Sequence, residues 1–275
     1  MEKKISIDTF LLKNSKILQH ELHNCKIDIL AFFFSVFVLK CKYQREKDGK
    51  KMKNKIQKFF KTEGYQYFES ALSAFGGLGI EALLAFWLEP MIYGHSMKEF
   101  TTSETIIHWS VTIVTWLVIA YLLVKSAKKN LGFRLKETEG KNGWLGICAS
   151  AALILLMVVE NYMTKGELKI IREFHKLGIL KFTFQHLYYL AEVVLITLII
   201  VFGQKALEKW FGKQNIPYGG ILLGLTWGLA HWFTKGSIWI GLEGLVVGFL
   251  FGASYLFLGR NLKKTYLVLA VAFII

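Results

Sequence analysis

Apolar residues fall in long blocks along this chain, rather than in the one-sided stripes of a soluble helix. The clearest block is Ile106–Val124, which runs for 19 residues without Asp, Glu, Lys or Arg. A helix needs about 20 mostly apolar residues to cross a bilayer. The other blocks are Tyr65–Tyr93, Trp144–Val159, Phe182–Gln204, Ile216–Thr234, Gly244–Gly259 and the shorter Thr265–Ile275. This pattern predicts an all-α, multi-pass transmembrane helical bundle of six to eight membrane segments.

Positive charge is distributed unevenly over the polar segments between the blocks. Lys42–Lys61 has nine Lys and Arg residues and Lys125–Gly143 has six, whereas Gly94–Thr105 has one and Asn161–Ile179 has four. Over all alternate loops the count is 21 on one set and 6 on the other. The positive-inside rule places the first set in the cytoplasm. We therefore expect a multi-pass integral membrane protein with its basic loops cytoplasmic.

Composition agrees with this interpretation and narrows the classes of partner. The chain is 53% hydrophobic and 20% charged, with 34 Lys+Arg against 20 Asp+Glu and a net charge of +14. In a membrane protein such an excess belongs to the cytoplasmic loops, so we do not expect a nucleic-acid partner. Membrane lipids, and a peptide or membrane protein as substrate or partner, are the expected contacts.

The cysteines and the common catalytic motifs exclude several kinds of site. Cys25, Cys41 and Cys148 form no CxxC pair, which excludes a disulfide scaffold and a cysteine zinc site. The sequence also contains no GxxxxGK[ST], HExxH or GxSxG motif. A divalent metal is not required by the sequence, and the identity of any cofactor stays open.

The first 51 residues differ from the rest of the chain. Their apolar run, Ile29–Leu39, has 11 residues, which is short for a span, and the basic stretch after it offers no signal-peptide cleavage site. We divide the chain into an N-terminal extension, residues 1–51, and a membrane-embedded helical domain, residues 52–275. Whether the extension holds a short membrane anchor, and whether it belongs to the mature protein, stays open.

Glu192 is the first candidate for chemistry. It lies near the middle of the block Phe182–Gln204, and an ionisable side chain inside a span indicates a functional site unless it is paired or hydrated. Tyr188 and Tyr189 precede it by one helical turn and could donate hydrogen bonds to it. The alternative is a protonated Glu192 that is bonded to a neighbouring helix.

His231, in the segment LTWGLAHW, is the second candidate. A neutral imidazole can bind a metal, hold a water or take a proton near neutral pH. The alternative is interfacial packing beside Trp227 and Trp232. Together with Glu192, His231 could activate a water molecule, with the carboxylate as general base.

Other polar residues of the apolar blocks are weaker candidates. Glu81 could pair with a basic group or face a cavity, and Glu243 suits the start of a helix. His108 and His186 lie near the ends of their blocks, where we expect them at the membrane interface. The pair Gly219-Gly220 indicates close helix packing.

Three segments together resemble the CAAX-protease and bacteriocin-processing (CPBP, or Abi) family of membrane proteins. They are the basic entry KKNLGFRLK at Lys128–Lys136, the Glu192 segment LAEVVLITLIIVFGQKA, and WGLAH at Trp227–His231, which is similar to the family's FxxxH motif. The resemblance runs from about residue 128 to the C-terminus. It implies an intramembrane glutamic or metallo endopeptidase in which Glu192 and His231 are catalytic.

The chain departs from the family at two places. In the EExxxR motif, Val193 stands at the second Glu and Thr197 at the Arg, and the last segment, TYLVLAVAFII, lacks the family's final His and its Asn or Asp partner. Two functions follow. One is an endopeptidase with an incomplete catalytic motif set, and the other is a non-catalytic membrane immunity or regulatory protein that binds a partner. A small transporter is a weaker third reading, because the chain shows no internal repeat.

The charge distribution gives a topology prediction. In a variant without its three cysteines, we expect Thr138→Cys to react with an impermeant thiol reagent only from the cytoplasm, and Ser103→Cys only from the opposite side. Labelling in intact cells and in inside-out vesicles measures this. Reaction of Thr138→Cys from outside intact cells would contradict the predicted number of spans.

Overall fold

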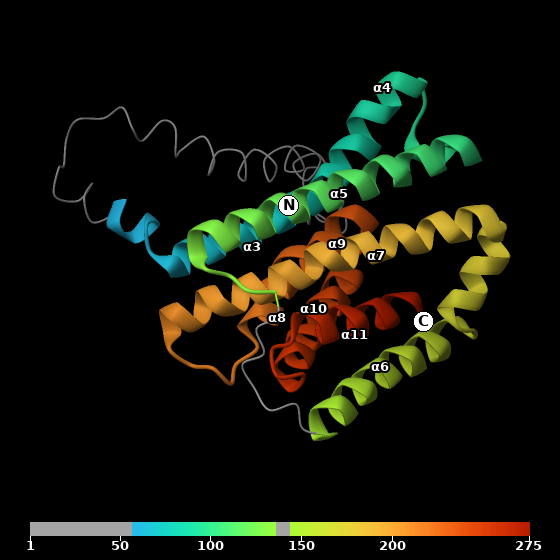
Figure 1. Cartoon of the computed structure of the whole chain (residues 1–275). Helices are drawn as coiled ribbons and strands as arrows, with labels where there is room; N and C mark the ends of the chain where they lie inside the picture. The colour runs from blue at the N-terminus through green and yellow to red at the C-terminus, as the bar shows by residue number, and fades with distance from the viewer. Residues whose placement is uncertain (1–56, 136–143) are drawn as a thin grey trace, which may run out of the picture. The chain divides into compact units, whose positions relative to one another are not determined.

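A computed structural model describes residues 57–135 and 144–275 of the chain. Cys25, Cys41 and the segment Ile29–Leu39 of the expected extension lie outside the described residues. Within the described ranges the regular structure is helical throughout and contains no strand (Figure 1). Five stretches are long and apolar enough to cross a membrane: Glu63–Tyr93, Thr102–Leu131, Gly146–Lys165, Lys169–Phe211 and Ile238–Phe257. The predicted all-α class is confirmed.

Most helices follow the apolar blocks but extend beyond them. They are α3 (Glu63–Leu83), continued by a π-helical turn and α4 (Glu89–Tyr93), α5 (Thr102–Leu131), α6 (Trp144–Lys165), α7 (Lys169–Phe211), α8 (Tyr218–Leu223), α9 (Leu229–Lys235), α10 (Ile238–Phe257) and α11 (Leu262–Ile274). A second π-helical turn, η4 (Gly224–Gly228), joins α8 to α9. Such turns insert an extra residue and re-aim the side chains around them.

The segment Asn161–Ile179 was expected to be a loop, and this expectation is wrong for most of its length. Helix α6 continues to Lys165, and α7 already begins at Lys169. The chain turns at Gly178, whose φ of 69° and ψ of 168° suit a residue without a Cβ. Apolar residues at helical spacing, such as Ile170, Phe174 and Leu177, make the segment before Gly178 helical.

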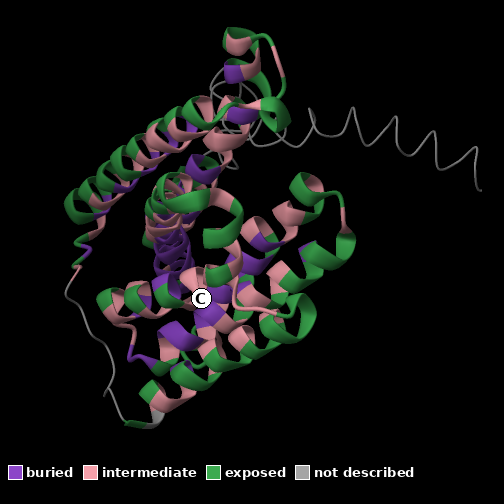
Figure 2. Cartoon of the chain, turned by 90° about the vertical axis from the view of Figure 1, so that its right-hand side faces the viewer, coloured by how far each residue is buried: buried purple, intermediate pink, exposed green. Residues whose placement is uncertain are grey.

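Helix α7 forms the centre of the described bundle. It packs against α3, α5, α8 and α11. Of its most apolar stretch 72% is buried, whereas the other four long apolar stretches are 6–33% buried. Figure 2 shows its C-terminal half as the most continuously buried part of the chain, and Leu195, Ile196, Ile199, Ile200 and Phe202 have no exposed surface. Glu192 therefore lies on the element whose position is most constrained.

Glycines let the backbones of the α8–η4–α9 segment and α10 touch. Gly220, Gly224 and Gly228 recur every fourth residue on one segment, opposite Gly244, Gly248 and Gly252 on α10. A Cβ at Gly248 would lie 2.6 Å from the Gly224 nitrogen, and one at Gly252 would lie 2.3 Å from the Gly220 Cα. Both distances are shorter than any real Cβ contact, so only glycine fits. The expectation of close packing at Gly219-Gly220 is confirmed.

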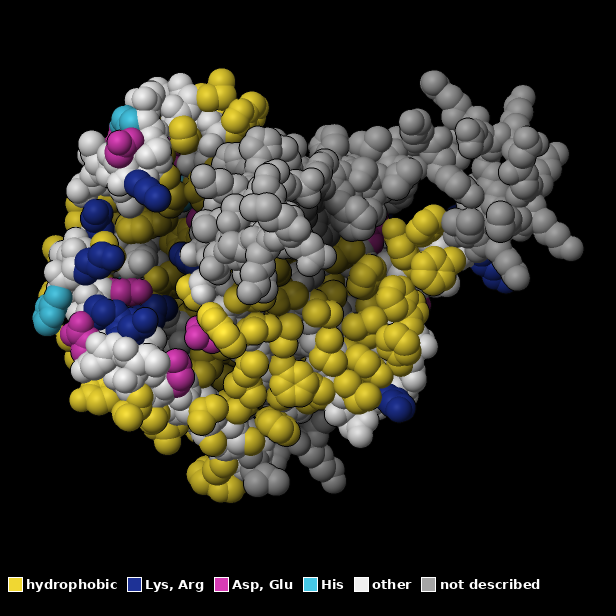
Figure 3. All heavy atoms as spheres, turned by 180° about the vertical axis from the view of Figure 1, so that it is seen from behind, with side chains coloured by type: hydrophobic (Ala, Val, Ile, Leu, Met, Phe, Trp, Pro, Cys, Tyr) yellow, Lys and Arg dark blue, Asp and Glu magenta, His cyan; other side chains and the backbone are white. Residues whose placement is uncertain are grey.

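The outer faces of the long helices are apolar. Large side chains that are more than half exposed include Phe86 on the α3–α4 stretch, Val114 on α5, Leu155 on α6 and Trp239 on α10. Figure 3 shows hydrophobic side chains joined into a broad area with few charged groups. Soluble monomers rarely expose contiguous apolar patches of more than a few hundred Å². The apolar exterior is compatible with an integral membrane protein.

The glycine crossing gives a stability prediction. We expect Gly248→Ala to lower the free energy of unfolding by about 1–3 kcal/mol, because the added methyl group forces the two backbones apart. Gly76→Ala is the matched control, since a Cβ there meets nothing within 4 Å. Unfolding in detergent, followed by circular dichroism, measures both. Equal stability of the two variants would contradict the crossing.

Candidate functional site

Glu192 is held by a tryptophan from another helical segment. Its carboxylate Oε1 accepts a hydrogen bond of 2.9 Å from the Trp227 indole Nε1. Trp227 lies in the π-helical turn η4, and the Glu192 side chain stays half-buried. Tyr188 and Tyr189, the two expected donors to Glu192, have other partners. The Tyr189 hydroxyl donates to Glu173 Oε1 at 2.9 Å, and Tyr188 interacts with Glu81. Trp227, the residue that donates to Glu192, was therefore not predicted as its donor.

His231 is bound to the same tryptophan. Its Nδ1 lies 2.8 Å from the Trp227 backbone carbonyl, and the two rings meet edge to face with centroids 4.5 Å apart. A carbonyl oxygen only accepts, so we assign the proton to Nδ1, which leaves the Nε2 lone pair available. The structure thus brings both predicted site residues to Trp227, Glu192 at its indole nitrogen and His231 at its carbonyl.

The α7 positions that depart from the family motif contribute no charge to this group. Val193 is fully buried, and the Thr197 hydroxyl donates to the Val193 carbonyl at 2.7 Å within its own helix. Glu243 is exposed on α10, and among the described residues no hydrogen bond or ion pair links it to Trp227. The group that the structure assembles is therefore Glu192, Trp227 and His231, which we call the Trp227 group.

A lysine and the C-terminal helix border the Trp227 group. The Lys169 ammonium donates to the Phe273 carbonyl and lies 4.2 Å from the centre of the Tyr189 ring. The Phe273 ring, on α11, lies 5.8 Å from that of Trp227. The charges of Lys169, Lys235 and Glu81 all act on Glu192. Lys169 and Lys235 thus favour the charged form of this carboxylate, whereas Glu81 opposes it.

A second polar cluster joins α3, α4 and α5. His108 is buried, with only 1% of its surface exposed, and its expected place near the membrane interface stays a prediction. Its Nδ1 lies 2.7 Å from Glu89 Oε2, and its Nε2 lies 3.8 Å from Glu81 Oε1. The sequence feature that could have indicated this cluster is the presence of Glu81 and Glu89 in one apolar block and of His108 in the next. Sequence alone does not tell which of these blocks pack together.

A metal does not fit the described residues. They contain no group of three His, Cys, Asp or Glu side chains that could hold an ion. Glu192 and His231 supply two ligands at most. A catalytic zinc site uses three protein ligands, so we derive no step through a metal.

Comparisons with protein-family models, with curated proteins and with solved structures find no match for this chain. The CPBP resemblance therefore rests on the residues that carry it, Lys128–Lys136, Glu192 and Trp227–His231.

The buried His108–Glu89 pair gives a second stability prediction. We expect Glu89→Ala to lower the free energy of unfolding by about 3–5 kcal/mol, because it leaves a buried imidazole without its partner. Glu89→Gln should lose less, since its amide oxygen still accepts the Nδ1 proton. Thermal unfolding in detergent measures both, with Glu243→Ala as the exposed control. If Glu89→Ala were as stable as this control, His108 would not depend on Glu89.

Proposed function

We propose that this chain is a CPBP-like integral membrane protein in which the Trp227 group binds a peptide or a segment of a membrane protein. The five long apolar helices, their exposed apolar faces and the alternation of basic loops support membrane insertion. With the α8–η4–α9 segment and α11 as further membrane segments, the described residues would supply seven, within the predicted six to eight. The basic loops would then lie in the cytoplasm.

The hydrogen bonds of Trp227 carry the proposal for binding. One oxygen of Glu192 and one nitrogen of His231 bond to Trp227, so the other oxygen and His231 Nε2 remain to meet a ligand. Polar groups of a peptide lose their water when they enter a membrane, which makes each new hydrogen bond important. A carboxylate held by the Trp227 indole and an imidazole held by the Trp227 carbonyl offer two acceptors on one residue.

Peptide hydrolysis is the second candidate function, in which Glu192 would be the base and His231 would position the water. Acyl transfer also needs hydrogen-bond donors aimed at the developing oxyanion. Val193 and Thr197 are turned into the core or bonded within their helix, so they supply none. We therefore expect peptidase activity to be weak or absent.

The variant Glu192→Gln separates the two functions, because it keeps size and an acceptor for Trp227 but removes the base. One assay follows cleavage of a pool of membrane-spanning peptides in proteoliposomes by mass spectrometry. The other follows adduct formation in native membranes, with a photo-reactive amino acid in place of Trp232, which is 38% exposed beside the site.

We expect no cleavage above the Glu192→Gln background, and a discrete adduct that persists in Glu192→Gln. The adduct should weaken about tenfold in Glu192→Leu, which removes one charge-assisted hydrogen bond. Glu243→Gln is the control at an exposed carboxylate. Cleavage products that disappear in Glu192→Gln would establish the peptidase instead, and loss of the adduct in Glu243→Gln would contradict the assigned site.

A further inference from the structure

The imidazole of His108 has a carboxylate at each of its two nitrogens. Glu89 Oε2, on α4, lies 2.7 Å from Nδ1, and Glu81 Oε1, on α3, lies 3.8 Å from Nε2. The first distance is that of a hydrogen bond, whereas the second is longer than one. Within the described part of the chain, Nε2 is buried without a hydrogen-bond partner, and so is the Thr112 hydroxyl one turn further along α5. Buried polar atoms that lack a partner are rare and need an explanation.

From Glu89, titratable groups continue to the exposed surface. Figure 1 shows α4 and the start of α5 at the same end of the bundle, and the loop between them is the one placed opposite the basic loops. In this region His95 Nε2 lies 3.3 Å from Glu104 Oε1, and 32% and 19% of the two side chains are exposed. The charges of Glu89 and Glu104 both act on Tyr93, the last residue of α4. Glu89 is therefore the inner end of a polar path from that surface.

On the other side of His108, Glu81 connects the imidazole to the Trp227 group. It lies eight residues before Glu89, which corresponds to about 12 Å along a helix that rises about 1.5 Å per residue. Glu81 interacts with Tyr188, and its charge also acts on Glu192, one turn after Tyr188 on α7. Because 30% of its side chain is exposed, the Glu81 carboxylate has room to turn between His108 and Tyr188.

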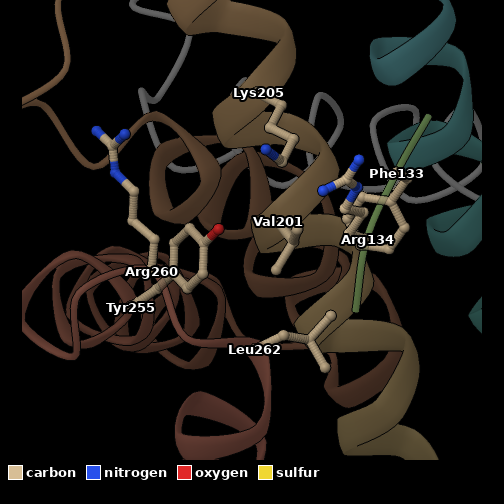
Figure 4. A pocket seen from close by; sticks show the side chains of 7 residues that line it. All are labelled: Phe133, Arg134, Val201, Lys205, Tyr255, Arg260 and Leu262. Atoms are coloured by element: carbon tan, nitrogen blue, oxygen red, sulfur yellow. The ribbon is translucent and has the colours of Figure 1, made fainter. Parts of the chain in front are cut away.

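The opposite end of α7 offers a different set of side chains. Figure 4 shows Arg134, Lys205 and Arg260 at a cavity of about 10 Å³, which has the space of about one water molecule. Arginine and lysine keep their protons near neutral pH, whereas carboxylates and imidazoles exchange theirs. The exchangeable groups that approach Glu192 through His108 therefore come from the end formed by α4 and α5.

We propose that Glu89, His108 and Glu81 form a proton relay between the surface opposite the basic loops and Glu192. In the inward step a protonated Glu89 gives its proton to Nδ1, and the proton on Nε2 moves to the Glu81 carboxylate. The imidazole is neutral before and after this step, and a half-turn of the ring restores the first form. Glu81 then passes the proton to the Glu192 carboxylate through the Tyr188 hydroxyl, which accepts one proton as it releases its own.

The relay gives buried ionisable residues of these spans a common purpose. Chains of Glu and His inside a membrane protein mark proton pathways, because each group is costly to bury unless it is used. Proton uptake at Glu192 removes the negative charge that a ligand of the Trp227 group meets, so ligand binding would respond to the pH at that surface. This consequence rests on the proposed binding function, whereas the proton transfer itself does not.

Time-resolved infrared spectroscopy of the full chain in proteoliposomes of one orientation tests the relay. The carboxyl band that is lost in Glu192→Gln reports the protonation of Glu192 after a pH jump on one side. We expect a rapid response to acid on the side at which Ser103→Cys is labelled. The response should be about a hundredfold slower in Glu81→Gln, because a positioned proton donor contributes about 10²–10⁴-fold to a rate.

Two further variants complete the test. Glu81→Gln keeps the bond between His108 and Glu89, and His108→Gln should slow the response to a similar extent if it folds. His186→Gln is the matched control, since the Nδ1 of His186 faces the Phe182 carbonyl rather than a carboxylate. It should respond at the rate of the unchanged protein.

The outcomes separate the relay from the proposed function. An unchanged rate in Glu81→Gln, an equal slowing in His186→Gln, or no Glu192 band that responds to pH would each overturn the relay. A response only to acid on the basic side would overturn it as well. Slowing in Glu81→Gln without an adduct at the Trp227 group would keep the relay and reject the binding function. If alkaline carbonate released the chain from membranes, the membrane location would fail, and the same rates in detergent would still test the relay.

Discussion

The contact on which the rest of the described bundle depends is made by the α8–η4–α9 segment, whose α8 lies between α7 and α10 and whose η4 and α9 pack on α10. Glycines lie on two sides of this segment. A Cβ at Gly219 would lie 2.1 Å from the Ile200 carbonyl of α7, while Gly220, Gly224 and Gly228 face α10. Backbones at this separation gain packing that larger side chains would prevent. These contacts fix the position of the segment. Trp227, which follows Gly224, is thereby held within hydrogen-bonding distance of Glu192 on α7.

Trp227 shows what this placement achieves. The glycines hold α8 against α7 and η4 against α10, and from η4 the Trp227 indole reaches Glu192 while the Trp227 carbonyl faces His231. A carboxylate among apolar helices costs several kcal/mol unless it is hydrogen-bonded or compensated by charge. The indole donor supplies the hydrogen bond, and the charges of Lys169 and Lys235 offset part of the cost against the opposing charge of Glu81. His108 on α5 and Glu89 on α4 are also buried, and each supplies the polar partner that the other needs.

The sequence predicted the helices well because a run such as Ile106–Val124 has no alternative to a long apolar helix. It failed at Asn161–Ile179, where charges at helical spacing resemble a polar loop until Gly178 is seen to provide the turn. Glu192 and His231 were recognisable because ionisable residues are rare in such blocks. Their common partner was not, because an indole that hydrogen-bonds through a π-helical turn has no sequence pattern. The meeting of His108 with Glu89 depends on which helices pack together, and periodicity does not encode that.

Helix α7 carries Glu192, and the geometry of this helix indicates how deep the Trp227 group lies. Glu192 and Lys205 are 13 residues apart, which corresponds to about 20 Å along an α-helix that rises about 1.5 Å per residue. If Lys205 lies at the headgroups of the basic side, Glu192 lies about 20 Å below them in a hydrocarbon core of about 30 Å. The Trp227 group then sits closer to the opposite surface. This agrees with the position of His231 near the end of α9 and of Lys169 at the start of α7, both at that end of the bundle. A ligand of Glu192 would accordingly enter from the surface opposite the basic loops or laterally from the lipid.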